Sequence, residues 1–379
     1  MDILIRGGHV IDPANGIDRV CDIAIRNGTI LAVGSIPALE NPEILDASGH
    51  YVVPGLVDMH THIFQGGSQF GFNADLLLPY GVTACVDAGT AGSANYEALH
   101  RILAQNQVRT YTFLNISPMG QMGSGLNENL DPALTDEAGI QRLIESYPGE
   151  IRGLKVRISR SIVGSYGSAP LKRALELGAR FRLPVCVHCT DPCIPMAEFA
   201  AMLRPGDILC HLYHGKGSTI LDDTGKVLPE VLNAAARGVI MDCANGRTNF
   251  SFDVAQKAIA QGFLPTVIST DLTAATVSKG RMVRNLPFLL SKYLNLGLSM
   301  PEVVSCATIA PAKALSLSDG TGTLSVGAQA DVAILKLSEQ RCEFLDSQGK
   351  SLTGNRMLTN QMTVSRGSIL FDANTLPHL

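Results

Sequence analysis

The sequence predicts an α/β protein: a (β/α)8 TIM barrel with a small β-sandwich domain built from both chain ends. Eight apolar, strand-like segments alternate with helix-compatible segments over roughly 260 residues, the number and length typical of such a barrel. Both ends of the chain carry short strand-like runs and turns instead. Reactive polar residues gather where the barrel strands are expected to end. Together these observations favour a barrel enzyme.

Length and composition exclude several functional classes. The chain has 379 residues, of which 46% are hydrophobic, so it can bury a large core. Its net charge of −4 gives no electrostatic reason to expect nucleic acid or an anionic membrane as a partner. The start, Met1–Gly8, lacks the regions of a secretory signal, and no apolar run approaches the ~18 residues of a membrane span. The nine cysteines lie mostly in apolar runs, which suits reduced thiols in a cytoplasmic protein.

The chain ends are expected to form one composite domain, residues 1–54 plus 316–379, around a barrel domain of residues 55–315. Asn27-Gly28 is a strong hairpin turn between two strand-like runs. Similar strand patterns return near the C-terminus. The runs that carry this prediction are Asp2–Ile5, Asp22–Arg26, Thr29–Val33, Gly327–Leu335 and Met362–Gly367.

The barrel prediction depends on eight strand candidates in order. A doubly wound open sheet is the competing architecture, but the Gly-x-Gly-x-x-Gly turn that would favour it does not follow the first strand. The expected strands are Gly55–His62, Val82–Ala88, Val108–Ile116, Ile151–Ile158, Val185–His188, Asp207–His211, Val239–Cys243 and Thr266–Asp271. Expected helices include Ala94–Gln105, Ala138–Ser146, Leu171–Phe181 and Asp253–Gln261.

The first barrel strand ends in a His-x-His motif. Asp58-Met59-His60-Thr61-His62 follows the apolar run 51–57. Side chains alternate along a strand, so Asp58, His60 and His62 share one face. Two imidazoles on one face provide half of a metal site. By itself, the motif could equally be an exposed pair of histidines.

Other strand ends add residues of the same chemistry. Barrel enzymes place their active sites at the C-terminal ends of the strands. Any one such residue would more often be structural, whereas a whole ring of them is hard to explain by core packing. The ring consists of His60 and His62 on strand 1, Lys155 on strand 4, His188 on strand 5, His211 on strand 6 and Asp271 on strand 8. This set predicts a metal centre.

With this ring in place, the chain resembles the amidohydrolase superfamily of metal-dependent hydrolases, which includes dihydroorotases and hydantoinases. The resemblance rests on the Val-Pro-Gly-Leu-Val-Asp-Met-His-Thr-His stretch at 53–62 and the Gly-Thr-Gly-Thr-Leu-Ser-Val-Gly-Ala-Gln-Ala-Asp stretch at 320–331. It covers nearly the whole chain, including the split β domain. These motifs are specific for the superfamily and much weaker for the substrate.

The resemblance implies two divalent metal ions, with zinc favoured by imidazole and carboxylate ligands. It implies that a metal-bridging hydroxide attacks an amide or ester carbonyl, with Asp271 as proton shuttle. It also implies that carbon dioxide carboxylates Lys155, so that an anionic carbamate bridges both ions. The implied ligands are His60, His62 and Asp271 for the buried ion, His188 and His211 for the other, and Lys155 for both.

Three stretches resemble the branch of the superfamily labelled amidohydrolase/deacetylase: 60–64, 211–215 and 270–273. This implies a deacylase of small acylated amino acids or hydroxy acids. A cyclic amidohydrolase of the dihydroorotase or hydantoinase type is the alternative. Dihydroorotases carry an arginine shortly after the His-x-His motif, and here Ile-Phe-Gln follows at 63–65. A non-catalytic interaction protein of the same fold is a third possibility, which the complete ligand set disfavours.

Residues near the same rim are weaker candidates. Arg157 shares the strand parity of Lys155 and could anchor a substrate carboxylate or form an ion pair. His214 could contact substrate or replace His211 as a ligand, and Asn245 could bind substrate or serve a turn. Asp58 could orient a ligating histidine. The expected partner is a small-molecule substrate, and self-association stays open.

Three further groups are weaker candidates for the site. Tyr213 and Arg247 are weaker substrate contacts. Cys186 and Cys189 have the spacing of a Cys-x-x-Cys motif, but residues three apart on a strand point to opposite faces. We therefore expect Cys186 to fill the barrel rather than to form a zinc or redox pair.

Overall fold

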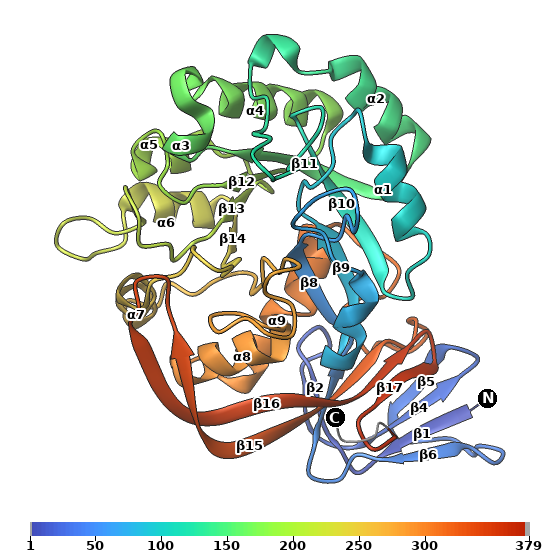
Figure 1. Cartoon of the computed structure of the whole chain (residues 1–379). Coiled ribbons are helices and arrows are strands. Elements are labelled where there is room, and N and C mark those ends of the chain that lie inside the picture. The colour runs from blue at the N-terminus through green and yellow to red at the C-terminus, as the bar shows by residue number, and fades with distance from the viewer. Residues whose placement is uncertain (1, 376–379) are drawn as a thin grey trace.

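The computed structural model describes residues 2–375 and contains the predicted barrel. Seven parallel strands form one curled sheet in chain order, β8 to β14, so the fold-class prediction is confirmed (Figure 1). The seven strands are β8 (Leu56–Thr61), β9 (Val82–Asp87), β10 (Arg109–Asn115), β11 (Ile151–Arg157), β12 (Val185–His188), β13 (Ile208–Cys210) and β14 (Ile240–Asp242). Their side chains are buried on both faces, as expected for a parallel sheet covered by helices.

The prediction of a regular eighth strand over Thr266–Asp271 is wrong. This segment makes only isolated bridges, Val267 with Asp242 of β14 and Leu272 with Thr61 of β8. Asp271 has a φ of 55°, a left-handed conformation that ends strand geometry. The segment still closes the barrel, because hydrogen bonds join it to β14 on one side and to β8 on the other.

Helices follow most barrel strands and cover the outside of the sheet (Figure 1). In α4, which contains the predicted helix 171–181, Leu171, Ala174 and Leu177 form a buried stripe beside β11 and β12. The α-helices are α1 (Tyr96–Leu103), α2 (Glu137–Ser146), α3 (Arg160–Val163), α4 (Ala169–Phe181), α5 (Met196–Met202), α6 (Pro229–Ala236), α7 (Phe252–Ala260), α8 (Leu286–Asn295), α9 (Met300–Cys306) and α10 (Ile309–Ala314). Short 3-10 helices span Ala74–Tyr80, Pro132–Leu134 and Gly164–Tyr166.

Two further sheets are built from the chain ends. A four-stranded sheet has the order β5-β4-β1-β6, and a six-stranded sheet has the order β17-β16-β15-β7-β2-β3. Their strands are β1 (Asp2–Arg6), β2 (His9–Asp12), β3 (Ile17–Val20), β4 (Asp22–Arg26), β5 (Thr29–Gly34), β6 (Glu43–Asp46), β7 (Tyr51–Pro54), β15 (Val332–Leu345), β16 (Ser351–Ser365) and β17 (Ser368–Asp372). One buried cluster joins side chains from both ends, such as Ile23 and Val332. The exact domain boundaries stay a prediction.

The hairpin β15–β16 extends beyond these sheets and was not expected from the sequence. Its distal half runs along α8 toward α7 (Figure 1). Ser291 of α8 accepts a hydrogen bond from the backbone of Leu358, and Asn295 donates to the carbonyl of Arg356. The hairpin turn, 346–350, reaches the segment 250–253 that follows β14. The C-terminal part of the chain therefore also packs against the barrel.

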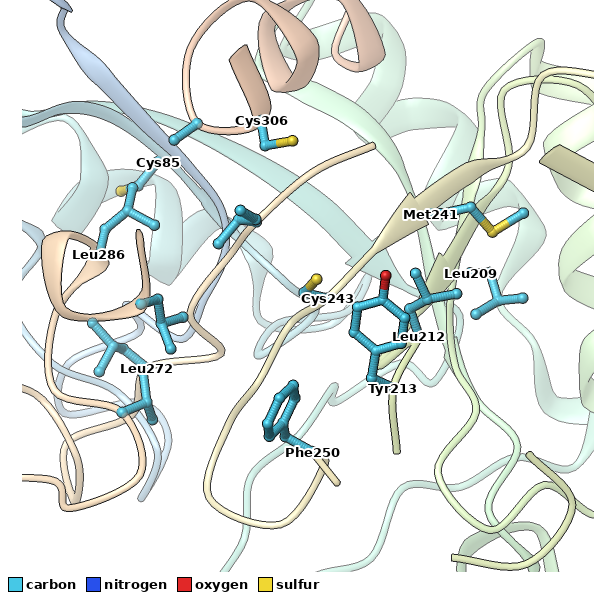
Figure 2. Packing of buried hydrophobic residues seen from close by; sticks show 14 of the residues in the cluster. Cys85, Leu209, Leu212, Tyr213, Met241, Cys243, Phe250, Leu272, Leu286 and Cys306 are labelled. Atoms are coloured by element: carbon cyan, nitrogen blue, oxygen red, sulfur yellow. The ribbon is translucent and has the colours of Figure 1, made fainter. Parts of the chain in front are cut away.

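The main core lies between the barrel sheet and its helices. Figure 2 shows Tyr213, Cys243 and Phe250 among the buried side chains of this cluster. The Tyr213 hydroxyl donates to the carbonyl of Phe263 at 2.9 Å, which satisfies its one buried donor. In the part of the chain that the structure describes, no helix is both long and apolar enough to cross a membrane.

Candidate active site

Three of the predicted ligands converge at the end of β8. The alternation of strand side chains brings His60 and His62 to one face, and the closing segment brings Asp271 to them. Nε2 of His62 lies 3.0 Å from Oδ1 of Asp271, and Nε2 of His60 lies 3.7 Å from the same oxygen. One ligand atom from each residue lies within 4.8 Å of the others. The structure therefore brings these three predicted ligands together.

Lys155 lies deeper, between this cluster and the barrel core. Its side chain is 1% exposed, and Nζ lies 3.2 Å from Nε2 of His60 and 3.4 Å from Sγ of Cys186. Gly89 packs against the lysine stem with a φ of 87°, and a Cβ there would collide with it. Among residues 2–375, no carboxylate lies within ion-pair distance of Nζ. Burial lowers the pKa of Lys155, but the combined attraction of Cys186, Cys210 and Asp271 outweighs burial, so the pKa of the amine is raised above its ordinary value.

His188 and His211 form the second half of the ring. Nε2 of His211 lies 2.7 Å from Nδ1 of His188. Nδ1 of His211 lies 2.6 Å from the carbonyl oxygen of Ala244, which fixes that nitrogen as the donor and leaves Nε2 free to bind a metal. Burial lowers the pKa of His211 to about 3 and that of His188 well below its ordinary value. Both rings are therefore neutral, which is the form that binds metals.

Two buried carboxylates, those of Asp242 and Asp58, lie behind His60 and Asp271. Oδ2 of Asp242 lies 3.4 Å from Nδ1 of His60, so Asp242 faces this ring nitrogen, on the side away from Asp271. Asp58, considered for that role from the sequence, instead accepts hydrogen bonds from the backbone and hydroxyl of Thr270, next to Asp271. Burial raises the pKa of Asp58 to about 7 and that of Asp242 to about 6. The position of Asp242 at the end of an apolar strand is the signal that could have identified it.

A cavity of about 470 Å³ opens above the ring. His60, His62, Lys155, His188 and Asp271 line its floor, so these five are accessible to a small molecule, whereas His211 lies behind them and is buried. The remaining wall is mostly polar. It consists of Gln69, Phe70, Gln121, Arg157, Arg247, Thr248, Asn249, Thr273, Ala275 and Thr276.

Of the three predicted substrate contacts, only Arg157 lines the cavity in the described part of the chain. Arg157 lies on the cavity wall, but its guanidinium is paired with Glu128, a buried carboxylate that also accepts from Asn115. His214 and Asn245 are fully buried and do not line the cavity. The amide oxygen of Asn245 accepts a hydrogen bond from the hydroxyl of a buried tyrosine at 2.9 Å. This geometry does not support direct substrate contact by either residue.

Three other side chains that the sequence singled out, those of Tyr213, Cys186 and Cys189, are buried. Tyr213 belongs to the core and lies outside the cavity wall. Cys186 faces the barrel interior, with its Sγ 3.0 Å from that of Cys210, and both are free thiols. Cys189 is buried, with its Sγ 2.9 Å from the carbonyl oxygen of Cys210.

Asn249 is a residue of this site that sequence reasoning missed. It lies on the loop after β14, and its Nδ2 donates to Oδ2 of Asp271 at 2.9 Å. The hydroxyl of Thr190 donates to its Oδ1, which fixes the orientation of the amide. Nothing in the local pattern distinguishes Asn249 from an ordinary loop asparagine.

The donor set fits two divalent cations. Neutral imidazoles and a carboxylate are ligands that zinc binds well. His60, His62 and Asp271 converge on one point, and His188 and His211 place two ring nitrogens together beside it. Lys155 contacts the first group, with its Nζ 3.2 Å from Nε2 of His60.

Known proteins share this architecture. The model of the amidohydrolase family matches residues 51–368. A deacetylase from Brucella anthropi is 32% identical over 95% of this chain and 90% of its own length. A crystal structure of a dihydroorotase is 31% identical, covers 98% of both chains and superposes with a TM-score of 0.88. A crystal structure of an adenine deaminase is 27% identical over 98% of this chain and 99% of its own, with a TM-score of 0.90. The chain belongs to the amidohydrolase family and is a metal-dependent hydrolase.

Proposed function

We propose that this enzyme is a binuclear deacylase, which hydrolyses the amide or ester bond of small acylated amino acids or hydroxy acids. The observation that carries the proposal is that five of the six predicted ligands line an open cavity of about 470 Å³, with the sixth, His211, 2.7 Å from His188. The similarity to a deacetylase over 95% of the chain supports an acyclic acyl group as the substrate.

In this proposal His60, His62 and Asp271 would hold one divalent cation, and His188 and His211 would hold the other. Carboxylated Lys155 would supply a further anionic oxygen ligand. When bound, such cations acidify a water molecule and polarise a carbonyl group. Because a raised pKa of Lys155 disfavours the free amine that carbon dioxide carboxylates, its carboxylation is expected to accompany metal binding.

Asp271 is the proposed acid–base residue. It lies at the cavity floor, where its Oδ2 accepts from Asn249 and its Oδ1 faces His62. A carboxylate held on both oxygens can accept the proton of the attacking water at a fixed position. It then returns this proton to the leaving nitrogen or oxygen, which completes hydrolysis.

A cyclic amidohydrolase is the second candidate, because the solved dihydroorotase superposes over 98% of the chain. Against it, the position where dihydroorotases carry an arginine after the His-x-His motif is occupied by Ile63, Phe64 and Gln65. A substrate panel separates the two candidates. The zinc-loaded enzyme is assayed for kcat/KM on N-acyl amino acids, O-acetyl hydroxy acids, dihydroorotate and hydantoins. We expect turnover of the acyclic compounds alone, and preference for a cyclic amide would overturn the proposal.

A further inference from the structure

Arg247 is a cation on the cavity wall whose charge is not neutralised by the protein. Its side chain is exposed, and among residues 2–375 it makes no ion pair or hydrogen bond. The other wall arginine, Arg157, is already paired with the buried Glu128. Of the two, Arg247 is therefore the guanidinium that remains free to bind an anion.

The charge of the cavity favours an anionic ligand. Asp271 is the one carboxylate among its described wall residues, whereas Lys155, Arg157 and Arg247 are basic. Glu128 offsets Arg157, and metal ions at the floor would add further positive charge. A guanidinium binds a carboxylate through two parallel hydrogen bonds, which gives both affinity and orientation.

Residues on either side of Arg247 are held against the proposed reacting centre. The N–H of Gly246 donates to the carbonyl of Thr270 at 2.9 Å, and Asn249 donates to Asp271 at 2.9 Å. Gly246 has a φ of 53°, and a Cβ there would collide with Oδ2 of Asp271. Arg247 therefore directly follows a glycine whose missing Cβ leaves room for the Asp271 carboxylate. The segment that bears the Arg247 side chain is thus held in place by hydrogen bonds on both sides.

We propose that Arg247 is the specificity-determining residue that binds the free carboxylate of the substrate, so that the enzyme selects acylated acids over neutral acyl compounds. This inference rests on the proposed deacylase function. It assigns the carboxylate anchor to the loop after β14 in place of Arg157 on β11.

The test combines one substitution with one change in the substrate. Wild type, Arg247→Met, Arg247→Lys and the surface control Arg101→Met are loaded with zinc. Acetate release is measured from O-acetyl lactate and N-acetyl alanine, in both enantiomers, and from the matching carboxamides. Losing a hydrogen-bonded charge pair should lower kcat/KM of Arg247→Met on the acids roughly ten-fold or more, mainly through KM. Its activity on the carboxamides should stay within about two-fold, and Arg247→Lys should recover part of the loss.

Calorimetric titration with lactate gives a second measurement that needs no turnover. Lactate should bind Arg247→Met about ten-fold more weakly than it binds wild type or Arg101→Met. Equal losses on acids and carboxamides, or unchanged lactate binding, would overturn the assignment of Arg247. If wild type released no acetate from any compound while lactate binding still depended on Arg247, the deacylase proposal alone would fail.

Discussion

Asn249 donates a hydrogen bond from Nδ2 to Oδ2 of Asp271 across 2.9 Å, and Thr190 holds the other end of the same amide. The hydrogen bond from Thr190 therefore fixes the orientation of the Asn249 amide, so that its Nδ2 faces Asp271. Because Oδ1 of Asp271 faces His62, the carboxylate is fixed on both of its oxygens. Asn249 is thus a positioning residue for the proposed proton transfer.

Replacing Asn249 with alanine is expected to lower kcat by roughly ten- to a hundred-fold, because a misplaced acid–base group loses part of its 10²–10⁴-fold contribution. Zinc content, measured by mass spectrometry, should not change. The loss should be larger for alkyl esters and amides than for aryl esters, whose leaving groups need no proton. An equal loss for all leaving groups would indicate a merely structural role. Asp271→Asn, which removes the carboxylate itself, should cost more.

Substitution of Lys155 tests the proposed carbamate. Lys155→Ala should lose most bound zinc and most activity, because the proposed anionic oxygen ligand is removed. Lys155→Glu, which restores a carboxylate, should retain more zinc than the alanine variant. In wild type, a carbamate carbon signal in ¹³C NMR after exchange with labelled bicarbonate should appear only in the zinc-loaded protein, because the raised pKa of Lys155 disfavours the free amine that carbon dioxide carboxylates. A metal-independent signal would contradict this coupling.

Asp346 connects the hairpin turn to the barrel. Its buried carboxylate accepts from the backbone N–H of Phe252 at 3.0 Å and from that of Gln348 at 2.8 Å. Asp346→Ala should lower the free energy of unfolding by about 1–3 kcal/mol, because a buried N–H loses its partner. Amide exchange at 250–252 should accelerate. Lys350→Met removes only the exposed ion pair with Asp253 and should cost at most about 1 kcal/mol. Equal effects of the two variants would contradict this role.

Lys292 gives a pH dependence with a defined sign. Burial lowers its pKa to about 7, and Nζ lies 4.5 Å from the centre of the Phe250 ring. An unfolded lysine titrates near a pKa of about 10.4, so between these values the unfolded state binds more protons. The contribution of Lys292 to stability therefore rises with pH from about 7 to about 10.

Urea unfolding of wild type and Lys292→Met from pH 6 to 10 measures this contribution. The difference in unfolding free energy between them should shift in favour of wild type as pH rises through this range. Lys313→Met, at an exposed lysine of α10, should show no such trend. A pH-independent difference for Lys292→Met would mean that its amine stays charged in the folded protein.

The sequence was informative wherever a local pattern decides the outcome. Apolar strand segments identified the barrel, and strand parity brought His60 and His62 together because side-chain alternation is a local property. The prediction of a regular eighth strand is wrong, because the backbone at Asp271 is left-handed and the apolar pattern of 266–271 does not reveal this.

Long-range pairings could not be read in this way. Glu128 lies in a loop far from Arg157 in sequence, and its charge decides whether that arginine is free. The choice between Asp58 and Asp242 as partner of the His60 ring likewise depends on how two strands face each other across the barrel. Such pairings require the assembled fold.

The pairing of β7 with β15 has a consequence for biosynthesis. Tyr51–Pro54 leads directly into β8 with its two histidines, yet one of its neighbours, β15, begins only at Val332. While the ribosome is still translating the barrel, this edge of β7 is without its native partner. Contacts that join such distant segments slow folding, because a long loop must close first. The sheet next to the His-x-His strand can therefore be completed only after nearly the whole chain has been made.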